Sequence, residues 1–160
     1  MLSLQEISDR LEIQDLVHRY AQIIDAKEFD LLREEIFCEN AFIDYSAFGG
    51  SKGNLDETIA FLHNAMKIFP NTQHLNANIQ ISLGRSAIGG EGAKLDSDQA
   101  IGRILCLNPQ EMQLPGHDSH IFFCGLWYID HYRRTRQGWR IAERIEEKSF
   151  VFNAPDFGAT

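Results

Sequence analysis

The feature that most constrains this chain is a change in the spacing of its apolar residues near Thr72. Before this residue they recur at helical intervals, and after it they alternate with polar residues over long stretches, as on a strand. Helices that come first and strands that follow them indicate an α+β fold rather than repeated strand–helix–strand units. We therefore expect three N-terminal helices packed on a curved antiparallel sheet, which together form a cone with an internal pocket.

The first predicted helix has two apolar faces. The apolar residues at the start of the helix lie on a different face from those that follow, which indicates a bend or a new start near Asp9. The two faces comprise Leu4, Ile7 and Leu11, and Ile13, Leu16, Val17, Tyr20 and Ile24. A short second helix is expected over residues 29–36. A third begins after Asn54, which can form a capping box with Glu57.

The rest of the chain predicts strands joined by loops. Alternating or β-branched and aromatic stretches mark strands over residues 41–45, 74–83, 99–107, 119–134 and 139–150. Residues 84–98 are rich in Gly and Ser, and residues 108–118 contain two prolines and Gly116, so both segments are predicted to be loops. No repeat or linker divides the chain, and residues 1–160 are expected to form a single domain.

Composition and charge narrow the class of protein. The chain has 160 residues and a formal net charge of −8, and this acidic balance argues against nucleic acid as a partner. No window approaches the roughly 18 apolar residues of a membrane-spanning helix, so no membrane partner is expected. The N-terminus lacks a secretory signal pattern, which predicts a cytoplasmic location. Cys38, Cys106 and Cys124 are odd in number and widely spaced, which predicts buried, reduced thiols.

Three polar residues are candidates for chemistry. Asp25 lies at the end of the first long helix, where the helix dipole and an apolar cavity would both raise the pKa of its carboxyl group. His74 lies at the start of the first long strand and could exchange protons with a substrate while Asp25 orients its ring. Tyr20 lies on the apolar helical face, where a buried phenol needs a partner. Each residue also has a purely structural interpretation, as a solvated helix end, a bonded histidine or a bonded phenol.

Other polar residues give weaker signals. On the long strand one face carries Tyr128, Asp130, Tyr132 and Arg134 and the other carries Trp127, Ile129, His131 and Arg133, but alternation alone does not say which face meets a cavity. His117, Asp118 and His120 lack a fourth ligand, so no metal site is predicted. The chain contains no dinucleotide fingerprint, P-loop or nucleophile elbow.

Several motifs together resemble the SnoaL-like family of the nuclear transport factor 2-like superfamily. The first is the run from Arg10 to Ala21 that continues to Ile24-Asp25, and the second is Phe42-Ile43-Asp44-Tyr45. Further along are Thr72-Gln73-His74, and Tyr128-x-Asp130-x-Tyr132-x-Arg134 followed by Gly138-Trp139-Arg140-Ile141. The resemblance spans roughly residues 4 to 145. It implies the cone described above and a homodimer or homotrimer.

The resemblance also implies a class of chemistry. Enzymes of this group include scytalone dehydratase, bile-acid 7α-dehydratase, hexachlorocyclohexane dehydrochlorinase and ketosteroid isomerase, and they use no cofactor. Asp25 and His74 match the family's Asp-His dyad, and Tyr20 matches a tyrosine of the dehydratases. A second acid that protonates a leaving group cannot be placed from the sequence.

These observations predict a cofactor-independent lyase of dehydratase type, or an isomerase, acting on a small hydrophobic substrate, cyclic compounds included. Asp25, His74 and Tyr20 are the candidate catalytic residues, and Arg103, Trp127, Tyr128 and His131 are candidates for binding the substrate. Two alternatives stay open. One is a domain that binds a small ligand without turnover, and the other is an accessory subunit like the small subunit of ring-hydroxylating dioxygenases.

Overall fold

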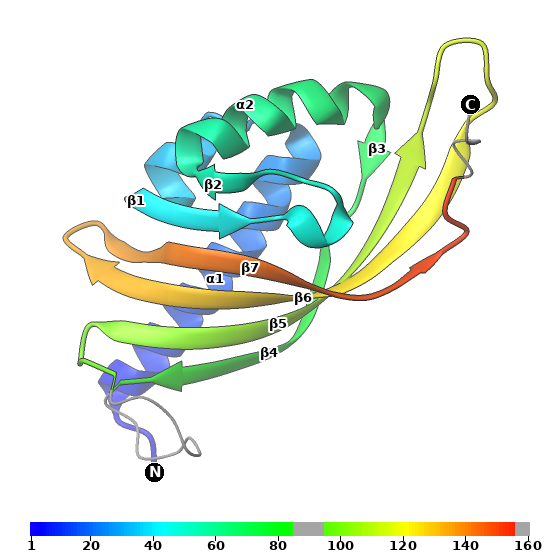
Figure 1. Ribbon diagram of the computed structural model, residues 1–160. Coiled ribbons are helices and arrows are strands. Elements are labelled where there is room, and N and C mark those ends of the chain that lie inside the picture. The colour runs from blue at the N-terminus through cyan, green and yellow to red at the C-terminus, as the bar shows by residue number, and fades with distance from the viewer. Residues whose placement is uncertain (85–94, 156–160) are drawn as a thin grey trace.

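The computed structural model describes residues 1–84 and 95–155, and it consists of helices packed on a curved, seven-stranded sheet (Figure 1). The helical segments are α1 (Leu4–Ala26), the π-helix η1 (Leu32–Ile36), the 3-10 helices η2 (Ser46–Phe48) and η3 (Met66–Ile68), and α2 (Leu55–Ala65). The strands are β1 (Phe37–Asp44), β2 (Lys52–Asn54), β3 (Asn71–Thr72), β4 (Leu75–Leu83), β5 (Gln99–Met112), β6 (His120–Thr135) and β7 (Gly138–Phe152). The predicted α+β class is confirmed.

Helix α1 runs unbroken across one face of the sheet, which we call the inner face (Figure 1). Ser3 caps it and forms the expected capping box with Glu6. The predicted new start near Asp9 is wrong, because α1 is one helix from Leu4 to Ala26. Asp9 is buried within it and accepts hydrogen bonds from Arg134 of β6 and from Trp139 of β7. The helix therefore continues through Asp9, and its early apolar residues Leu4, Ile7 and Leu11 are exposed.

Two details of the predicted architecture need correction. The expectation of three N-terminal helices is not confirmed, since α1 is the one long helix before the sheet begins and α2 follows strands β1 and β2. The sheet is mixed rather than antiparallel, because β1 pairs in parallel with the last strand, β7. The pairs β1–β2 and β6–β7 are antiparallel. Local periodicity identifies each strand but carries no information about a neighbour a hundred residues away.

The predicted loop over residues 108–118 begins too early, because β5 continues through Pro109 to Met112. A central proline is tolerated here for a reason visible in the pairing. The carbonyl of Pro109 accepts a hydrogen bond from the backbone N–H of Gln73, 3.1 Å away, so its missing N–H also faces that side of the strand. On that side lies the break between β3 and β4, where no ladder bond is lost.

The same break and a bulge in β4 place His74 on the inner face. Asn76 pairs with Cys106, and Ile81 pairs with Gly102. Cys106 and Gly102 lie on the same face of β5, so Asn76 and Ile81 both face inward. Strict alternation would instead place two residues an odd number of positions apart on opposite faces. The register shifts by one residue between Ala77 and Gln80, where Asn78 has a positive φ of 45°. Because of this bulge, β4 directs polar side chains inward at its start and apolar side chains inward at its end.

The core lies between α1 and the inner face of the sheet. One stripe of α1 is buried there, which includes Ile13, Val17, Tyr20 and Ile24. The long hairpin of β6 and β7 supplies much of the opposing surface. Cys38, Cys106 and Cys124 are buried and free, as predicted. Within residues 1–84 and 95–155, no helix combines the length and apolar character needed to cross a membrane.

Candidate active site

A cavity of about 170 Å³ opens between α1, α2 and the inner face of β5, β6 and β7. Its walls are mostly apolar, with contributions from Ile24, Phe61, Leu62, Met66, Phe69 and Leu126. Polar groups interrupt this surface at a few places: Tyr20, Tyr45, His74, Asn108, Tyr128 and Glu146. An apolar chamber with a few convergent polar groups is the usual form of a small-molecule site.

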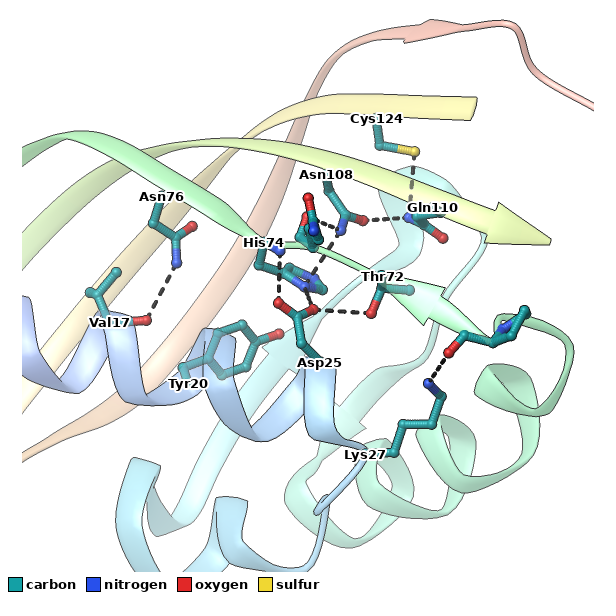
Figure 2. Close-up of polar contacts among 12 residues, drawn as sticks. Val17, Tyr20, Asp25, Lys27, Thr72, His74, Asn76, Asn108, Gln110 and Cys124 are labelled. Atoms are coloured by element: carbon teal, nitrogen blue, oxygen red, sulfur yellow. Dashed lines mark hydrogen bonds and ion pairs between the residues drawn. The ribbon is translucent and has the colours of Figure 1, made fainter. Parts of the chain in front are cut away.

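His74 enters this cavity with its ring held from behind by Asp25 (Figure 2). The distance from His74 Nδ1 to Asp25 Oδ1 is 2.6 Å, and the backbone N–H of His74 donates to Asp25 Oδ2 at 3.0 Å. The structure thus brings together the two residues that the sequence predicted as a pair. Because the Nδ1 proton points to the carboxylate, the Nε2 lone pair is left free to accept a proton. Nε2 has no hydrogen-bond partner among the described residues.

Asp25 is ionised rather than neutral, which corrects the expectation of a raised pKa. Burial acts to raise the pKa of Asp25, but the hydrogen bonds from His74 and Thr72 and the electrostatic interaction with His74 outweigh it. Thr72 adds a third donor, with its hydroxyl 3.0 Å from Asp25 Oδ1. The net result is a pKa below the ordinary value. Helix α1 ends at Ala26 and is capped by Lys27, so Asp25 lies in the last helical turn, where its carboxylate meets these three donors.

The segment that carries His74 is fixed by two amides of β5 (Figure 2). Asn108 is buried and donates from Nδ2 to the carbonyl of Gln73, 2.9 Å away, while its Oδ1 accepts a hydrogen bond from Gln110. The Asn108 amide nitrogen lies 3.4 Å from His74 Nδ1, much farther than Asp25 does. The carboxylate is therefore the main partner of the ring.

A pair of tyrosines forms the wall next to His74. Tyr20 from α1 and Tyr45, just after β1, share a hydrogen bond of 2.8 Å between their hydroxyl groups. The ring of Tyr20 also meets those of His74 and Tyr128 edge-on, with centroids 6.2 Å and 5.7 Å away. Burial raises the pKa of all three tyrosines, so they are neutral and can donate hydrogen bonds near neutral pH. Since one hydroxyl of the pair donates to the other, the second keeps a proton that the pair does not use, and Tyr128 also interacts with Tyr20.

The fully buried ion pair of Arg144 and Asp130 packs against the rings of Tyr20 and Tyr128. Arg144 contacts Asp130 through two hydrogen bonds of 2.7 Å and 2.6 Å, and its guanidinium lies 4.1 Å from the ring centroids of both Tyr20 and Tyr128. Tyr132 donates to the same carboxylate at 2.7 Å. This arrangement settles which face of β6 meets the cavity: the face of Tyr128, Asp130 and Tyr132 points inward.

The other three residues predicted to bind substrate lie on the opposite face of the sheet. Arg103 makes an ion pair of 2.9 Å with Glu147 and stacks over the ring of Trp127, 4.0 Å from its centroid. The ring of His131 is half exposed and lies 4.0 Å from Glu143. Because neighbouring residues of a strand point to opposite faces, the inward placement of Tyr128 directs Trp127 outward. Arg103, Trp127 and His131 therefore do not line the cavity with His74, and of the four only Tyr128 does so.

Two cavity residues were missed in the sequence. Tyr45 belongs to a motif that the sequence displays, but nothing there indicates that its hydroxyl meets Tyr20. Glu146 is a partly buried carboxyl group in the cavity wall, within a stretch of β7 where charged residues occur on both faces. Burial is the main cause that raises the pKa of Glu146, and the pKa reaches about 8. Alternation on β7 gives no sign of which charge is the inward one.

Comparison with known proteins places this geometry in a family. A SnoaL-like domain matches residues 5–145. The uncharacterized protein Rv2910c of Mycobacterium tuberculosis is 39% identical over 150 residues, which cover 94% of this chain and 92% of that protein.

Solved structures share the fold at low identity. A scytalone-dehydratase-like protein from Novosphingobium aromaticivorans has a TM-score of 0.74 and 17% identity, covering 93% of this chain and 89% of its own. The hexachlorocyclohexane dehydrochlorinase LinA-type3 from Novosphingobium barchaimii has a TM-score of 0.72 and 15% identity, covering 98% and 97%. With most of its length matched by the domain, the chain belongs to the SnoaL-like domain family, as its motifs predicted.

Proposed function

We propose that this protein is a cofactor-independent lyase of dehydratase type, in which His74 removes a proton from carbon and a leaving group departs from the neighbouring position. The observation that carries the proposal is the short contact between Asp25 and the ring of His74 at the wall of an otherwise apolar cavity. Membership of the SnoaL-like family, and structural neighbours named for dehydratase and dehydrochlorinase activities, support the same class of reaction.

In this mechanism Asp25 is a positioning residue and His74 is the base. The carboxylate accepts the Nδ1 proton, fixes the tautomer and stabilises the imidazolium that forms when Nε2 takes a proton. Its low pKa suits this role, because a carboxylate that stays ionised keeps its charge available to the ring. General base catalysis of this kind contributes roughly 10²–10⁴-fold to a rate.

The tyrosine pair supplies the second element of the reaction. Removal of a proton next to a carbonyl group places negative charge on the carbonyl oxygen, and a neutral phenol in a dry site stabilises that charge. Tyr20 and Tyr45 keep one O–H that is not used in the hydrogen bond between them, and the rings of Tyr20 and His74 lie 6.2 Å apart, centroid to centroid. We therefore propose that the substrate carries a carbonyl oxygen that points at this pair.

The size and lining of the cavity define the substrate class. An engineered apolar cavity of about 150 Å³ holds one benzene molecule, and the cavity here has about 170 Å³. The proposed substrate is thus a small hydrophobic compound of about one ring, with a carbonyl group and a leaving group.

The base function can be tested without knowledge of the natural substrate. We expect the protein to accelerate exchange of the α-protons of cyclohexanone in D₂O, followed by proton NMR, because abstraction of such a proton requires only the base and the oxyanion donor. The His74→Gln variant should lose about 100-fold or more of the acceleration. His131→Gln is the matched control, since this histidine lies on the outer face.

Three results would decide between the functions considered. Exchange that depends on His74 supports the base function on which the lyase rests. Conversion of 3-cyclohexenone to 2-cyclohexenone, a rearrangement without loss of a leaving group, would instead identify an isomerase. Binding of cyclohexanone without any exchange would contradict the proposal and leave a domain that binds ligands without turnover.

A further inference from the structure

Glu146 lies in the cavity wall beside the tyrosines and has no role in the base mechanism above. It faces inward from β7 and pairs in register with Tyr128 of β6, which also lines the cavity. Tyr128 contacts Tyr20 edge-on, and Tyr20 contacts His74 in the same way. The wall therefore runs from the imidazole through two phenols to this carboxyl group.

The carboxyl group of Glu146 is free to interact with a ligand. It makes no hydrogen bond or ion pair with any residue within 1–84 and 95–155, although it is partly buried. A carboxyl group removed from water normally has a partner, so an unpaired one in a cavity points to a ligand as the missing partner. The desolvated, partnerless setting is also the reason that the pKa of Glu146 rises to about 8, which keeps the carboxyl group protonated at neutral pH.

The charged groups around Glu146 act in opposite directions. On β1 the ionised Asp44 raises the pKa of Glu146, and on its own strand Arg144 lowers it. The phenols that interact with it, Tyr20, Tyr45 and Tyr128, are neutral near pH 7. The thiols of Cys106 and Cys124, on β5 and β6, also have raised pKa values of about 12 and about 11. Arg144 can therefore stabilise the Glu146 carboxylate after it has given up its proton.

Glu146 and His74 approach the cavity from separate parts of the sheet. Strands β5 and β6 lie between their two segments, which corresponds to a backbone separation of roughly 14 Å at about 4.8 Å per strand. Both side chains line the cavity of about 170 Å³, a volume that suits about one ring. A ligand in that space would meet the imidazole on one side and the carboxyl group on the other.

From this geometry we propose that Glu146 is the general acid of the site and that the substrate is a β-hydroxy carbonyl compound, whose leaving hydroxyl group receives the Glu146 proton. The inference rests on the proposed elimination and makes it specific. A hydroxide ion leaves poorly unless it is protonated, whereas a halide needs no proton, so a protonated carboxyl group in this place selects for an oxygen leaving group.

The proton and electron balance of the step is complete. The C–H bond breaks, its proton goes to His74 Nε2, and its electron pair forms the carbon–carbon double bond. The C–O bond breaks with its pair going to oxygen, and the Glu146 O–H bond breaks as its proton joins that oxygen to form water. The site is left with an imidazolium and a carboxylate, and a proton passes from His74 to Glu146 through water to restore the starting state.

The test compares two compounds that give the same product by loss of different groups. Both 3-hydroxycyclohexanone and 3-chlorocyclohexanone yield 2-cyclohexenone, whose ultraviolet absorption is followed after subtraction of the uncatalysed rate. We expect Glu146→Gln to lose about 100-fold or more in kcat/KM with the hydroxy compound, and less than about fivefold with the chloro compound. His74→Gln should lose activity with both compounds. Glu147→Gln is the matched control, because Glu147 is the next residue and points to the outer face.

The outcomes separate the two proposals. Equal losses with both compounds in Glu146→Gln would overturn the acid role while the elimination stands. Absence of turnover of either compound by the unmodified protein would overturn the elimination, and the acid role with it. The thermal unfolding temperature of each variant shows whether the fold is intact, and Glu146→Asp, which keeps an acid, should retain more activity with the hydroxy compound than Glu146→Gln does.

A measurement without turnover tests the protonation state directly. Infrared difference spectra between pH 6 and pH 9 should contain the C=O band of a protonated carboxyl group, and Glu146→Gln should lack it. If the band is absent from the unmodified protein, Glu146 holds no proton to donate and the proposal fails.

Discussion

Two carboxyl groups serve the same cavity, and their surroundings give them opposite charges. Asp25, behind His74, accepts three hydrogen bonds and has a lowered pKa, whereas Glu146, in the far wall, accepts none from the described residues and has a pKa of about 8. Burial pushes the pKa of both groups upward. The difference shows that local hydrogen-bond donors, rather than burial alone, decide which carboxyl group is ionised.

This contrast assigns complementary tasks to the two ends of the site. The ionised group can hold a neighbouring imidazole and stabilise its positive charge, while the protonated group can give up a proton. Environments that drive the pKa values of two titratable groups apart are typical of acid–base sites. Substitutions of Asp25 and Glu146, or of the groups that set their pKa values, test this division of tasks.

The largest effect is expected when the charge behind His74 is removed. Asp25→Asn should lower kcat for 3-hydroxycyclohexanone about 10³-fold with little change in KM, because the neutral amide neither fixes the tautomer nor stabilises the imidazolium. Asp30→Asn serves as control, since Asp30 is exposed and its carboxylate lies 3.4 Å from an exposed histidine. An Asp25→Asn protein with a normal fold and full activity would refute the positioning role.

At the other end of the site, stability should depend on the charge of Glu146. Its pKa is about 8 in the folded protein and 4.5 ordinarily, so the folded state holds the proton more tightly. The contribution to stability is fully present below pH 4.5 and is lost as pH rises through about 8. Glu146→Gln should therefore gain stability relative to the unmodified protein between pH 5 and pH 9, by on the order of 2 kcal/mol or roughly 4–8 °C in Tm. A constant difference across this range would mean that Glu146 titrates normally.

The pairing of Asp25 with His74 was accessible to sequence reasoning, while the position of the acid was not. The end of an amphipathic helix and the start of an alternating strand are each visible locally, and both lie where a covering helix meets its sheet. The alternation on β6 and β7 is symmetric, since a pattern of period two is the same for either face. Trp127 and Tyr128 therefore look equally suited to a pocket in the sequence, and only the register with Glu146 and Arg144 places Tyr128 inside.

The bulge at Asn78 in β4 is a second feature that alternation in the sequence does not predict. A strict alternation would put His74 and Ile81 on opposite faces, yet both face inward, because one extra residue shifts the register between them. The parallel pairing of β1 with β7 is a third case, since it joins distant segments without a local turn signal. In each case the missing information is a pairing between strands, which a single chain's periodicity does not contain.

A smaller effect is expected when one donor to Asp25 is removed. Thr72→Val keeps the shape of the buried side chain but removes the hydroxyl that bonds to Asp25 Oδ1. The loss of about 1 kcal/mol should lower kcat roughly fivefold. The low pKa of Asp25 stabilises the fold above its ordinary value of 3.8, and this contribution is lost as pH falls through the lower folded value.

Acid unfolding provides the second measure of the same donor. Since the folded pKa of Asp25 moves up toward 3.8 in Thr72→Val, the variant should start to unfold at a higher pH than the unmodified protein does. Thr58→Val is the control, because that buried hydroxyl donates to the carbonyl of Asn54, which caps the same helix, and not to Asp25. Unchanged acid unfolding in Thr72→Val would show that His74 alone sets the charge of Asp25.

The smallest effect concerns the charge that helps to keep Glu146 protonated. Asp44 has a pKa of about 2, because Lys52 and Ser46 hydrogen-bond to it, so it is ionised throughout the working range and raises the pKa of Glu146. Asp44→Asn should shift the alkaline decline of kcat/KM for 3-hydroxycyclohexanone to lower pH by roughly half a unit. The decline follows deprotonation of the acid, so the profile for 3-chlorocyclohexanone should not move with it. Asp56→Asn controls for the change in net charge, because Asp56 is exposed and pairs with Arg33 on the surface. A decline that stays at the same pH in Asp44→Asn would mean that burial alone keeps the proton on Glu146. The charge of Asp44 on β1 would then not contribute to the difference in pKa between Glu146 and Asp25.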